Sequence, residues 1–187
     1  MENFTIVRNA LSLPTCLLID TTLKMLKDTH YIIRKIDPDN KHYFAEPGVP
    51  VNCWAAYAPM ITEGLLLQMQ PQIEEIVGEA LFPTYSYARI YWNGAYMKKH
   101  TDRPQCEVSV SLTISADTTP WPLIFNGHEL DINPGDMVVY KGTELSHWRA
   151  KYRGTEQTQV MLHYVFQNGL SRNLKFDGRE AIGMSRL

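Results

Sequence analysis

From Tyr85 onward, hydrophobic and polar residues alternate in short runs that predict a series of β-strands. In residues 107–115 the even-numbered positions are hydrophobic and the odd-numbered ones polar, so this strand has one apolar and one polar face. Turn residues such as Asn126-Gly127 separate the runs. Many short strands at this spacing predict a β-sandwich or barrel. The other predicted strands are residues 85–91, 121–125, 136–140, 146–149 and 157–166.

Residues 1–80 have a different pattern, in which hydrophobic residues recur with a helical period. We expect one helix from about residue 17 to 30 and a second from about 59 to 81, kinked or divided at Pro71. Between them, residues 37–50 are rich in turn formers and predict a loop. These helices are expected to form a support region that covers one sheet. From residue 167 to 187 the chain is polar and predicts an extended or partly mobile tail.

The composition suits one globular domain over residues 1–187 and argues against several classes of partner. A net charge of -2 without a long basic run gives no electrostatic case for nucleic-acid binding. The apolar stretches are too short to span a membrane, and the N-terminus lacks the basic and apolar regions of a signal peptide. The 3 cysteines have no metal-binding or redox spacing, which indicates reduced thiols and a cytoplasmic protein.

The candidate chemistry begins at His100-Thr101-Asp102. Side chains two residues apart on an extended strand point to the same face, so His100 and Asp102 can reach one metal ion. A second histidine from a distant strand would complete a set of two histidines and one carboxylate. This set leaves coordination positions open and is typical of non-haem Fe(II) oxygenases.

Three histidines downstream are candidates for the missing ligand. His147 follows a turn, an apolar strand and a short loop, which puts it at the start of a new strand. His128 lies beside Gly127 in a turn and is expected at the surface, and His163 lies within the last strand, where a hydrogen-bonded core residue is expected. We therefore favour His147, with His163 second.

The spacing around this triplet is more specific than the triplet itself. Tyr91-x-x-Gly94-x-x-Met97-x-x-His100-x-Asp102 resembles the Y-x-x-G-x-x-L-x-x-H-x-D pattern of the Fe(II)/2-oxoglutarate-dependent dioxygenases, in their prolyl-hydroxylase-like branch. Residues 133–147 resemble the family's P-x-G strand and distal histidine. The resemblance implies a mainly β fold with N-terminal helices, in which residues 85–166 form a double-stranded β-helix core of the jelly-roll, cupin-like type.

The resemblance also implies a reaction. Fe(II) would be held by His100, Asp102 and His147, 2-oxoglutarate would chelate the metal through its keto-acid end, and O2 would take the last position. The co-substrate would leave as succinate and CO2 while a C–H bond of a peptidyl or small-molecule substrate is hydroxylated. The presence of Asp102 favours hydroxylation over halogenation, because related halogenases lack the carboxylate.

The chain departs from the family where the second carboxylate of 2-oxoglutarate is bound. The family places an arginine or lysine about ten residues past the distal histidine, but residues 156–159 contain no cation. Arg149 should share the inward face with His147 and can bind a carboxylate through two donors, so it is the first replacement. Arg153 in the loop before the last strand is the second. Gln159 or Gln157 is a candidate hydrogen-bond partner of the same carboxylate, and so is Tyr91.

Two other readings of the sequence stay open. The missing cation favours a cupin-like metal-dependent enzyme or binding protein that does not use 2-oxoglutarate, although the H-x-H pair typical of cupins is absent. A fold alone does not fix a function, so a non-catalytic binding module on a β-sandwich is the other reading. It would require His100, Asp102 and His147 to be incidental.

Overall fold

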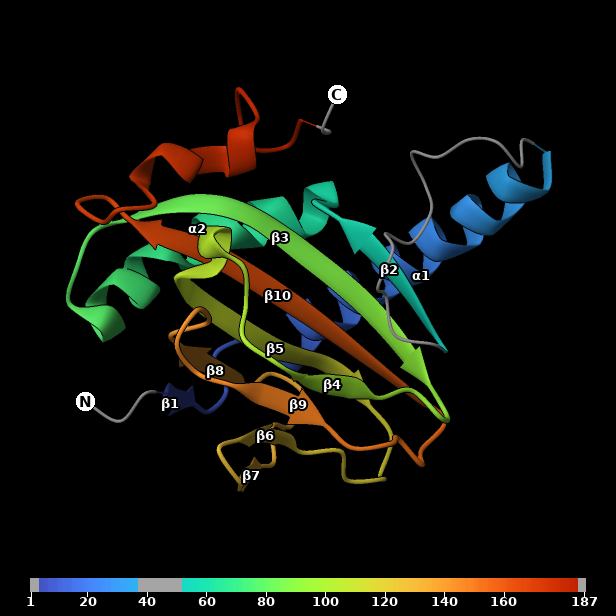
Figure 1. Ribbon diagram of the computed structural model, residues 1–187. Helices are drawn as coiled ribbons and strands as arrows, with labels where there is room; N and C mark the ends of the chain where they lie inside the picture. Colours follow the sequence, from blue (N-terminus) through green and yellow to red (C-terminus); the bar gives the residue numbers. More distant parts are fainter. Residues whose placement is uncertain (1–3, 37–51, 185–187) are drawn as a thin grey trace.

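Two antiparallel sheets face each other in the computed structural model, which describes residues 4–36 and 52–184 (Figure 1). The larger sheet has the strand order β1-β8-β5-β10-β3-β2, and the smaller has the order β4-β9-β6-β7. The strands of the larger sheet are β1 (Phe4–Val7), β2 (Cys53–Tyr57), β3 (Leu81–Trp92), β5 (Val108–Ala116), β8 (Met137–Tyr140) and β10 (Glu156–Phe166). Those of the smaller sheet are β4 (Met97–His100), β6 (Leu123–Phe125), β7 (His128–Leu130) and β9 (His147–Arg149).

The hydrophobic core lies between the larger sheet and two helices on its outer face. Helix α1 spans Leu13–Ile36 and helix α2 spans Met60–Val77, and both contribute to one buried cluster with the sheet. Leu112 of β5, for example, is 0% exposed and belongs to this cluster. Burial of this kind is the main stabilising contribution to such a fold. The β-rich core with N-terminal helices over one sheet is therefore as predicted.

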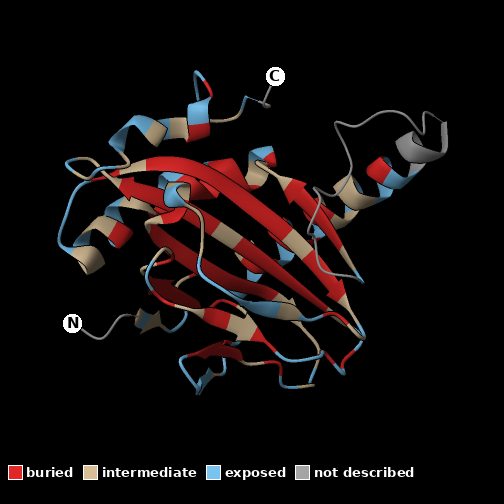
Figure 2. Cartoon of the chain, in the orientation of Figure 1, coloured by how far each residue is buried: buried red, intermediate tan, exposed pale blue. Residues whose placement is uncertain are grey.

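Strand β5 explains how the two faces of the larger sheet differ. Its even-numbered residues, such as Val110, pack under the helices, whereas Ser111 points to the space between the sheets and lines a cavity there. Both faces of β5 are buried over most of its length, and the central strands of the larger sheet are mostly red in Figure 2. The alternation in the sequence thus separates a core face from a site-facing one rather than a core face from solvent.

Two expectations about the first 80 residues need correction, and a third is not tested. Strand β1 pairs with β8 (Phe4 opposite Tyr140), and β2 pairs with β3, so the segment extends the larger sheet at both edges as well as supporting it. Helix α2 also runs unbroken through Pro71. This proline lacks the N–H that would bond the Leu67 carbonyl, and both residues are exposed, so water can satisfy that carbonyl. The loop predicted at residues 37–50 lies outside the described residues.

The C-terminal segment was predicted as an extended or partly mobile tail, and this is wrong. Residues Arg172–Gly178 form successive short turns (η3), which pack against β3 and β10. The side chains of Asp177 and Arg179 are buried, so the segment is anchored by charged groups that sequence polarity alone assigned to solvent. Within the part of the chain that the structure describes, no helix is both long and apolar enough to traverse a membrane.

Candidate metal centre

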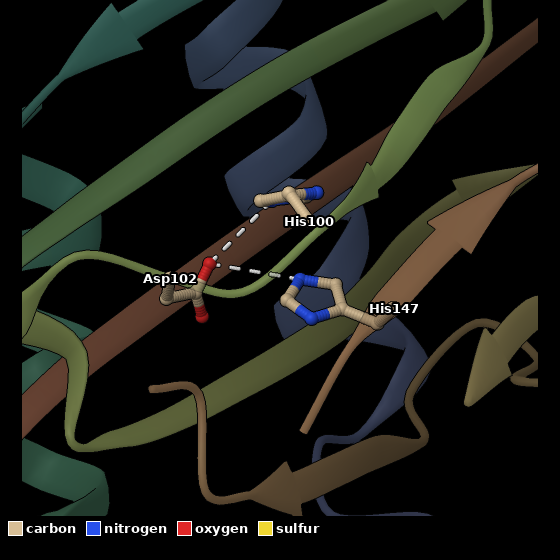
Figure 3. Close-up of side chains that lie close together, drawn as sticks. All are labelled: His100, Asp102 and His147. Atoms are coloured by element: carbon tan, nitrogen blue, oxygen red, sulfur yellow. Dashed lines mark ion pairs between the residues drawn. The ribbon is translucent and has the colours of Figure 1, made fainter. Parts of the chain in front are cut away.

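Two histidines and one carboxylate meet where the smaller sheet opens toward the larger one. His100 ends β4 and His147 begins β9, and the two are opposite each other in the antiparallel register. Asp102 follows β4 and is fixed by its backbone N–H, which donates to the Gly142 carbonyl over 2.8 Å. The three side chains converge on one point (Figure 3).

The distances within this group suit a single metal ion. Nε2 of His100 and Nε2 of His147 each lie 3.6 Å from Oδ1 of Asp102. One potential ligand atom from each of the three residues lies within 4.8 Å of the others. Two imidazole nitrogens and one carboxylate oxygen on one side of an ion form the facial arrangement of non-haem Fe(II) sites, with further positions left for ligands.

Backbone carbonyls orient both imidazoles. Nδ1 of His100 lies 2.8 Å from the Lys98 carbonyl, and Nδ1 of His147 lies 3.0 Å from the Leu145 carbonyl. A carbonyl only accepts, so each Nδ1 is the protonated nitrogen and each Nε2 keeps its lone pair toward Asp102. Outer contacts of this kind fix ring orientation and tautomer in metal sites.

The protonation states also suit a cation. Burial lowers the pKa of His147, which favours the neutral imidazole that a metal requires. Burial alone would raise the pKa of Asp102, but the adjacent imidazoles, His100 first, bring it below its ordinary value. In the ion-free site the neighbouring Asp102 carboxylate in turn raises the pKa of His100. Asp102 is therefore ionised at neutral pH and supplies the anionic ligand.

The three side chains line a cavity of about 300 Å³ between the sheets. Four residues of β3 on one face form one wall, and β10 contributes three more; they are Tyr85, Tyr87, Arg89, Tyr91, Gln159, Met161 and His163. Among the described residues that line the cavity, Asp102 is the sole carboxylate, whereas three are arginines. The cavity is therefore built to receive negative charge.

Arg149 lies deep in this cavity, as its spacing from His147 predicted. It is 4% exposed, and its guanidinium carbon lies 4.8 Å from the ring centre of Trp121. Nη1 donates to the Trp121 carbonyl, but Nη2 is buried without a hydrogen-bond partner. Burial lowers the pKa of Arg149 to about 10, so it stays charged at neutral pH. A buried cation with an unpaired donor is rare in native proteins, because it costs free energy unless a ligand satisfies it.

The other residues predicted to bind the co-substrate fall into two groups. Tyr91 and Gln159 line the cavity with Arg149, and both are 2% exposed. Gln159 is held in place by Thr113, whose Oγ1 accepts from Nε2 over 2.8 Å. Arg153 is exposed and is absent from the described lining of the cavity, so the structure does not bring it to the site.

Sequence reasoning missed several residues around the triad. Ser109 donates from Oγ to Oδ2 of Asp102 over 2.7 Å, and the hydroxyl of Tyr140 lies 3.4 Å from Nε2 of His147. His163 is buried, as expected, and its Nδ1 lies 3.1 Å from the Ser109 hydroxyl. The polar face of the 107–115 strand was the available signal for Ser109, since that face had to point to something polar. His128 is exposed on β7.

Comparison with known proteins gives structural but not sequence relatives. No protein-family model matches the chain, and no curated protein matches its sequence. The structure is similar to that of HygX from Streptomyces hygroscopicus with nickel and 2-oxoglutarate bound, with a TM-score of 0.66 and 8% identity over 89% of this chain and 84% of that one.

Two further solved structures are similar to this chain in fold. A viral collagen prolyl hydroxylase from Paramecium Bursaria Chlorella virus-1, in its 2-oxoglutarate complex, has a TM-score of 0.61 and 10% identity over 87% of this chain and 96% of that one. An oxidoreductase of the 2OG-Fe(II) oxygenase family from Burkholderia pseudomallei has a TM-score of 0.63 and 14% identity over 91% of this chain and 87% of that one. The chain thus has the double-stranded β-helix fold that these oxygenase structures share.

Proposed function

We propose that the protein is a non-haem Fe(II)- and 2-oxoglutarate-dependent dioxygenase. It would convert a substrate C–H, O2 and 2-oxoglutarate into the C–OH product, succinate and CO2. The observation that carries this proposal is the combination, in one cavity, of the His100, Asp102 and His147 group with the unpaired cation of Arg149. The substrate class we propose is a small molecule or a peptide, which enters the cavity beside the metal.

The donor set fits Fe(II). His100 and His147 present their Nε2 atoms, and Asp102 presents a carboxylate oxygen, which is the ligand set that leaves positions for a chelating co-substrate and O2. A bound Fe(II) would supply the redox chemistry that couples decarboxylation of 2-oxoglutarate to oxidation of the substrate. The protein's part is to hold the two reactants in place and to keep the site enclosed by the two sheets.

Arg149 is the proposed anchor for the far carboxylate of 2-oxoglutarate. Its Nη2 is buried and unpaired, and among the described residues no carboxylate pairs with it. The planar guanidinium binds carboxylates through charge-assisted hydrogen bonds. Tyr91 and Gln159 line the same part of the cavity and are proposed as its neutral partners. Arg153 is left out of this proposal because it is exposed.

A cupin-like metal enzyme without 2-oxoglutarate is the second candidate. It is favoured by the neutral residues of the last strand, where Gln157 and Gln159 are buried at positions that usually carry the cation. Against it stands Arg149, which supplies a cation from β9 instead. The two candidates differ in one measurable property, the binding of 2-oxoglutarate to the metal-loaded protein.

The deciding experiment is an anaerobic titration of the Fe(II)-loaded protein with 2-oxoglutarate. The visible charge-transfer band of the chelate reports binding. We expect the band in the wild type and in Arg153→Gln, the matched exposed-arginine control. Arg149→Gln should weaken 2-oxoglutarate binding by about 10- to 100-fold, the value of a charged hydrogen bond. Iron binding without a band in the wild type would replace this proposal with the second candidate. Equal 2-oxoglutarate affinities for Arg149→Gln and Arg153→Gln would show that Arg149 does not bind the co-substrate.

A further inference from the structure

Arg89 places a second cation in the cavity, on a different wall from Arg149. It lies on β3, where its sheet neighbours are Gln159 of β10 on one side and Ala55 of β2 on the other. Its side chain is on the cavity-lining face of the strand and is half-buried, whereas Arg149 is 4% exposed. A ligand group that enters the cavity therefore meets Arg89 before it reaches Arg149.

One edge of the Arg89 guanidinium has no protein partner among the described residues. Nη1 donates to the Tyr91 hydroxyl over 3.3 Å, and the guanidinium carbon lies 5.1 Å from the ring centre of Tyr87. Nε is buried and has no hydrogen-bond partner. The ion pairs among residues 4–36 and 52–184 all involve other groups. The Nε–Nη2 edge carries two parallel N–H donors, which match the two oxygens of a carboxylate.

Arg103, the remaining arginine of the lining, is not equivalent to Arg89. Its Nη2 lies 3.2 Å from Oδ2 of Asp177 and its Nε donates to the Tyr85 hydroxyl over 3.2 Å, so its charge is already paired. Arg89 also donates to a tyrosine hydroxyl, but among the described residues it has no carboxylate partner.

The charges in the cavity assign Arg89 to the substrate, an argument that rests on the function proposed above. The charges of Fe(II), Asp102, 2-oxoglutarate and Arg149 cancel, and Arg103 is balanced by Asp177. Arg89 then leaves the loaded cavity with one unbalanced positive charge. Arg89 lines the same cavity as the three candidate metal ligands, so its charge lies near the metal position. A single negative charge on the substrate would restore neutrality beside the reacting atoms.

We propose that Arg89 is the specificity-determining residue for a substrate that carries a carboxylate. The carboxylate would lie on the Nε–Nη2 edge, with the adjacent carbons held between the tyrosines of β3 and the metal. A cavity of about 300 Å³ that also holds 2-oxoglutarate admits a small group, either an amino acid or the C-terminal residue of a peptide. A phosphate would bring a second negative charge that Arg89 alone does not balance.

The test compares acids with their amides, which differ by one charge at nearly constant shape. Panels of amino acids, N-acetyl amino acids and tripeptides, each as the C-terminal acid and the primary amide, are added to the 2-oxoglutarate-loaded protein. Binding is measured by thermal shift with Ni(II) in place of Fe(II), and turnover by succinate release with Fe(II). We expect at least one acid to bind 10-fold or more tightly than its amide. A preference shown only by free amino acids would identify an amino acid as the substrate. A preference shown by the tripeptide acids would identify the C-terminus of a peptide.

Variants then attribute the preference to Arg89. Arg89→Gln should remove the difference between acid and amide, Arg89→Lys should restore part of it, and Arg153→Gln should keep all of it. The proposal is overturned if no acid in the panel binds better than its amide, or if the preference survives in Arg89→Gln. Loss of the 2-oxoglutarate charge-transfer band in Arg89→Gln would also overturn it, by assigning Arg89 to the co-substrate. Absence of the band from the wild type would instead reject the proposed function.

Discussion

Ser109 and Asp102 are joined by a hydrogen bond of 2.7 Å from the serine hydroxyl to Oδ2 of the carboxylate. The other oxygen, Oδ1, is the one that lies 3.6 Å from Nε2 of both His100 and His147. The serine thus divides the carboxylate into one oxygen held by the protein and one that faces the candidate metal position. Ser109 is 0% exposed and lies on β5, an interior strand of the larger sheet, so the carboxylate is oriented before any ion binds.

Replacement of Ser109 by alanine should therefore weaken metal binding without unfolding the protein. We expect Ser109→Ala to reduce Fe(II) or Ni(II) affinity by about 10- to 100-fold, the usual effect of losing an outer contact of a ligand. Ser115→Ala is the matched control, because Ser115 lies on the same strand and donates to a different carboxylate, Asp20, over 2.9 Å. Isothermal titration of both variants gives the answer. Equal metal affinities for the two would show that Ser109 does not orient the ligand.

Gly142 supports the same carboxylate by leaving room for it. A Cβ at this position would collide with Oδ2 of Asp102, the Cys106 carbonyl and Oγ of Ser109. Because those atoms are held by hydrogen bonds, Gly142→Ala should displace Asp102, lower metal affinity by at least about 10-fold and destabilise the fold by about 1–3 kcal/mol.

Gly64 in helix α2 is the contrasting position for this experiment, since a Cβ there meets nothing within 4 Å and the residue is exposed. Gly64→Ala should stabilise the protein by about 0.5–1 kcal/mol and leave metal affinity unchanged. Thermal unfolding and metal titration measure both effects. A Gly142→Ala protein with normal metal affinity would mean that the loop gives way without moving Asp102.

The local part of this site was predictable from the sequence, and the supporting part was not. His100 and Asp102 are two residues apart, and the strand–turn–strand pattern placed His147 at the start of a strand, with His163 as the second candidate. The resemblance of the spacing from Tyr91 to Asp102 to the oxygenase pattern then made the group specific. Ser109 and Gly142 come to Asp102 from β5 and from the loop before β9. Their contacts depend on how the two sheets face each other, which alternation within a single strand does not specify.

The edge strands β1 and β2 and the C-terminal turns were not predicted from the sequence, for a related reason. Strand β1 has only four residues, with one exposed and three partly buried, so it lacks the alternation that identified the longer strands. Strand β2 and the C-terminal turns are ordered by pairing and by buried charges. Propensity is a weak guide where partners distant in the sequence decide the structure.

The buried ion pair between Glu63 and Arg179 provides a test of that C-terminal anchor. Oε2 of Glu63 lies 2.8 Å from Nη1 of Arg179, and the two side chains are 1% and 2% exposed. Glu63 also accepts from the backbone and hydroxyl of Ser86 over 2.8 Å each. Removal of one partner leaves the other charge buried and unpaired, so we expect Glu63→Ala to cost about 3–5 kcal/mol in the free energy of unfolding.

An exposed ion pair serves as the control for this measurement. Lys141 and Glu144 lie 3.4 Å apart with side chains 44% and 61% exposed. Glu144→Ala should change stability by less than about 1 kcal/mol, because exposed pairs contribute little. Urea unfolding of both variants measures the difference. A Glu63→Ala protein as stable as Glu144→Ala would show that the C-terminal turns do not depend on this pair.

The pH dependence of stability should report on His163, whose pKa burial lowers to about 4. In the unfolded chain a histidine titrates near pH 6.5, so between about pH 6.5 and pH 4 the unfolded state binds a proton that the native state does not. The stabilising contribution is therefore complete above about pH 6.5 and is lost as the pH falls toward 4. Over this window we expect a loss on the order of 1–3 kcal/mol.

Two histidine variants isolate this effect from the other titrating groups. His163→Asn should lose less stability between pH 7 and pH 5 than the wild type, whereas His128→Gln, which removes an exposed histidine, should follow the wild type. The free energy of unfolding from urea titrations of metal-free protein at the two pH values gives the comparison. Asp102 and Asp136 do not contribute to the stability change between pH 7 and pH 5, because their pKa values lie below the usual carboxylate range. Identical pH slopes for His163→Asn and the wild type would mean that His163 can take up a proton in the folded protein, through movement of the strand or entry of water.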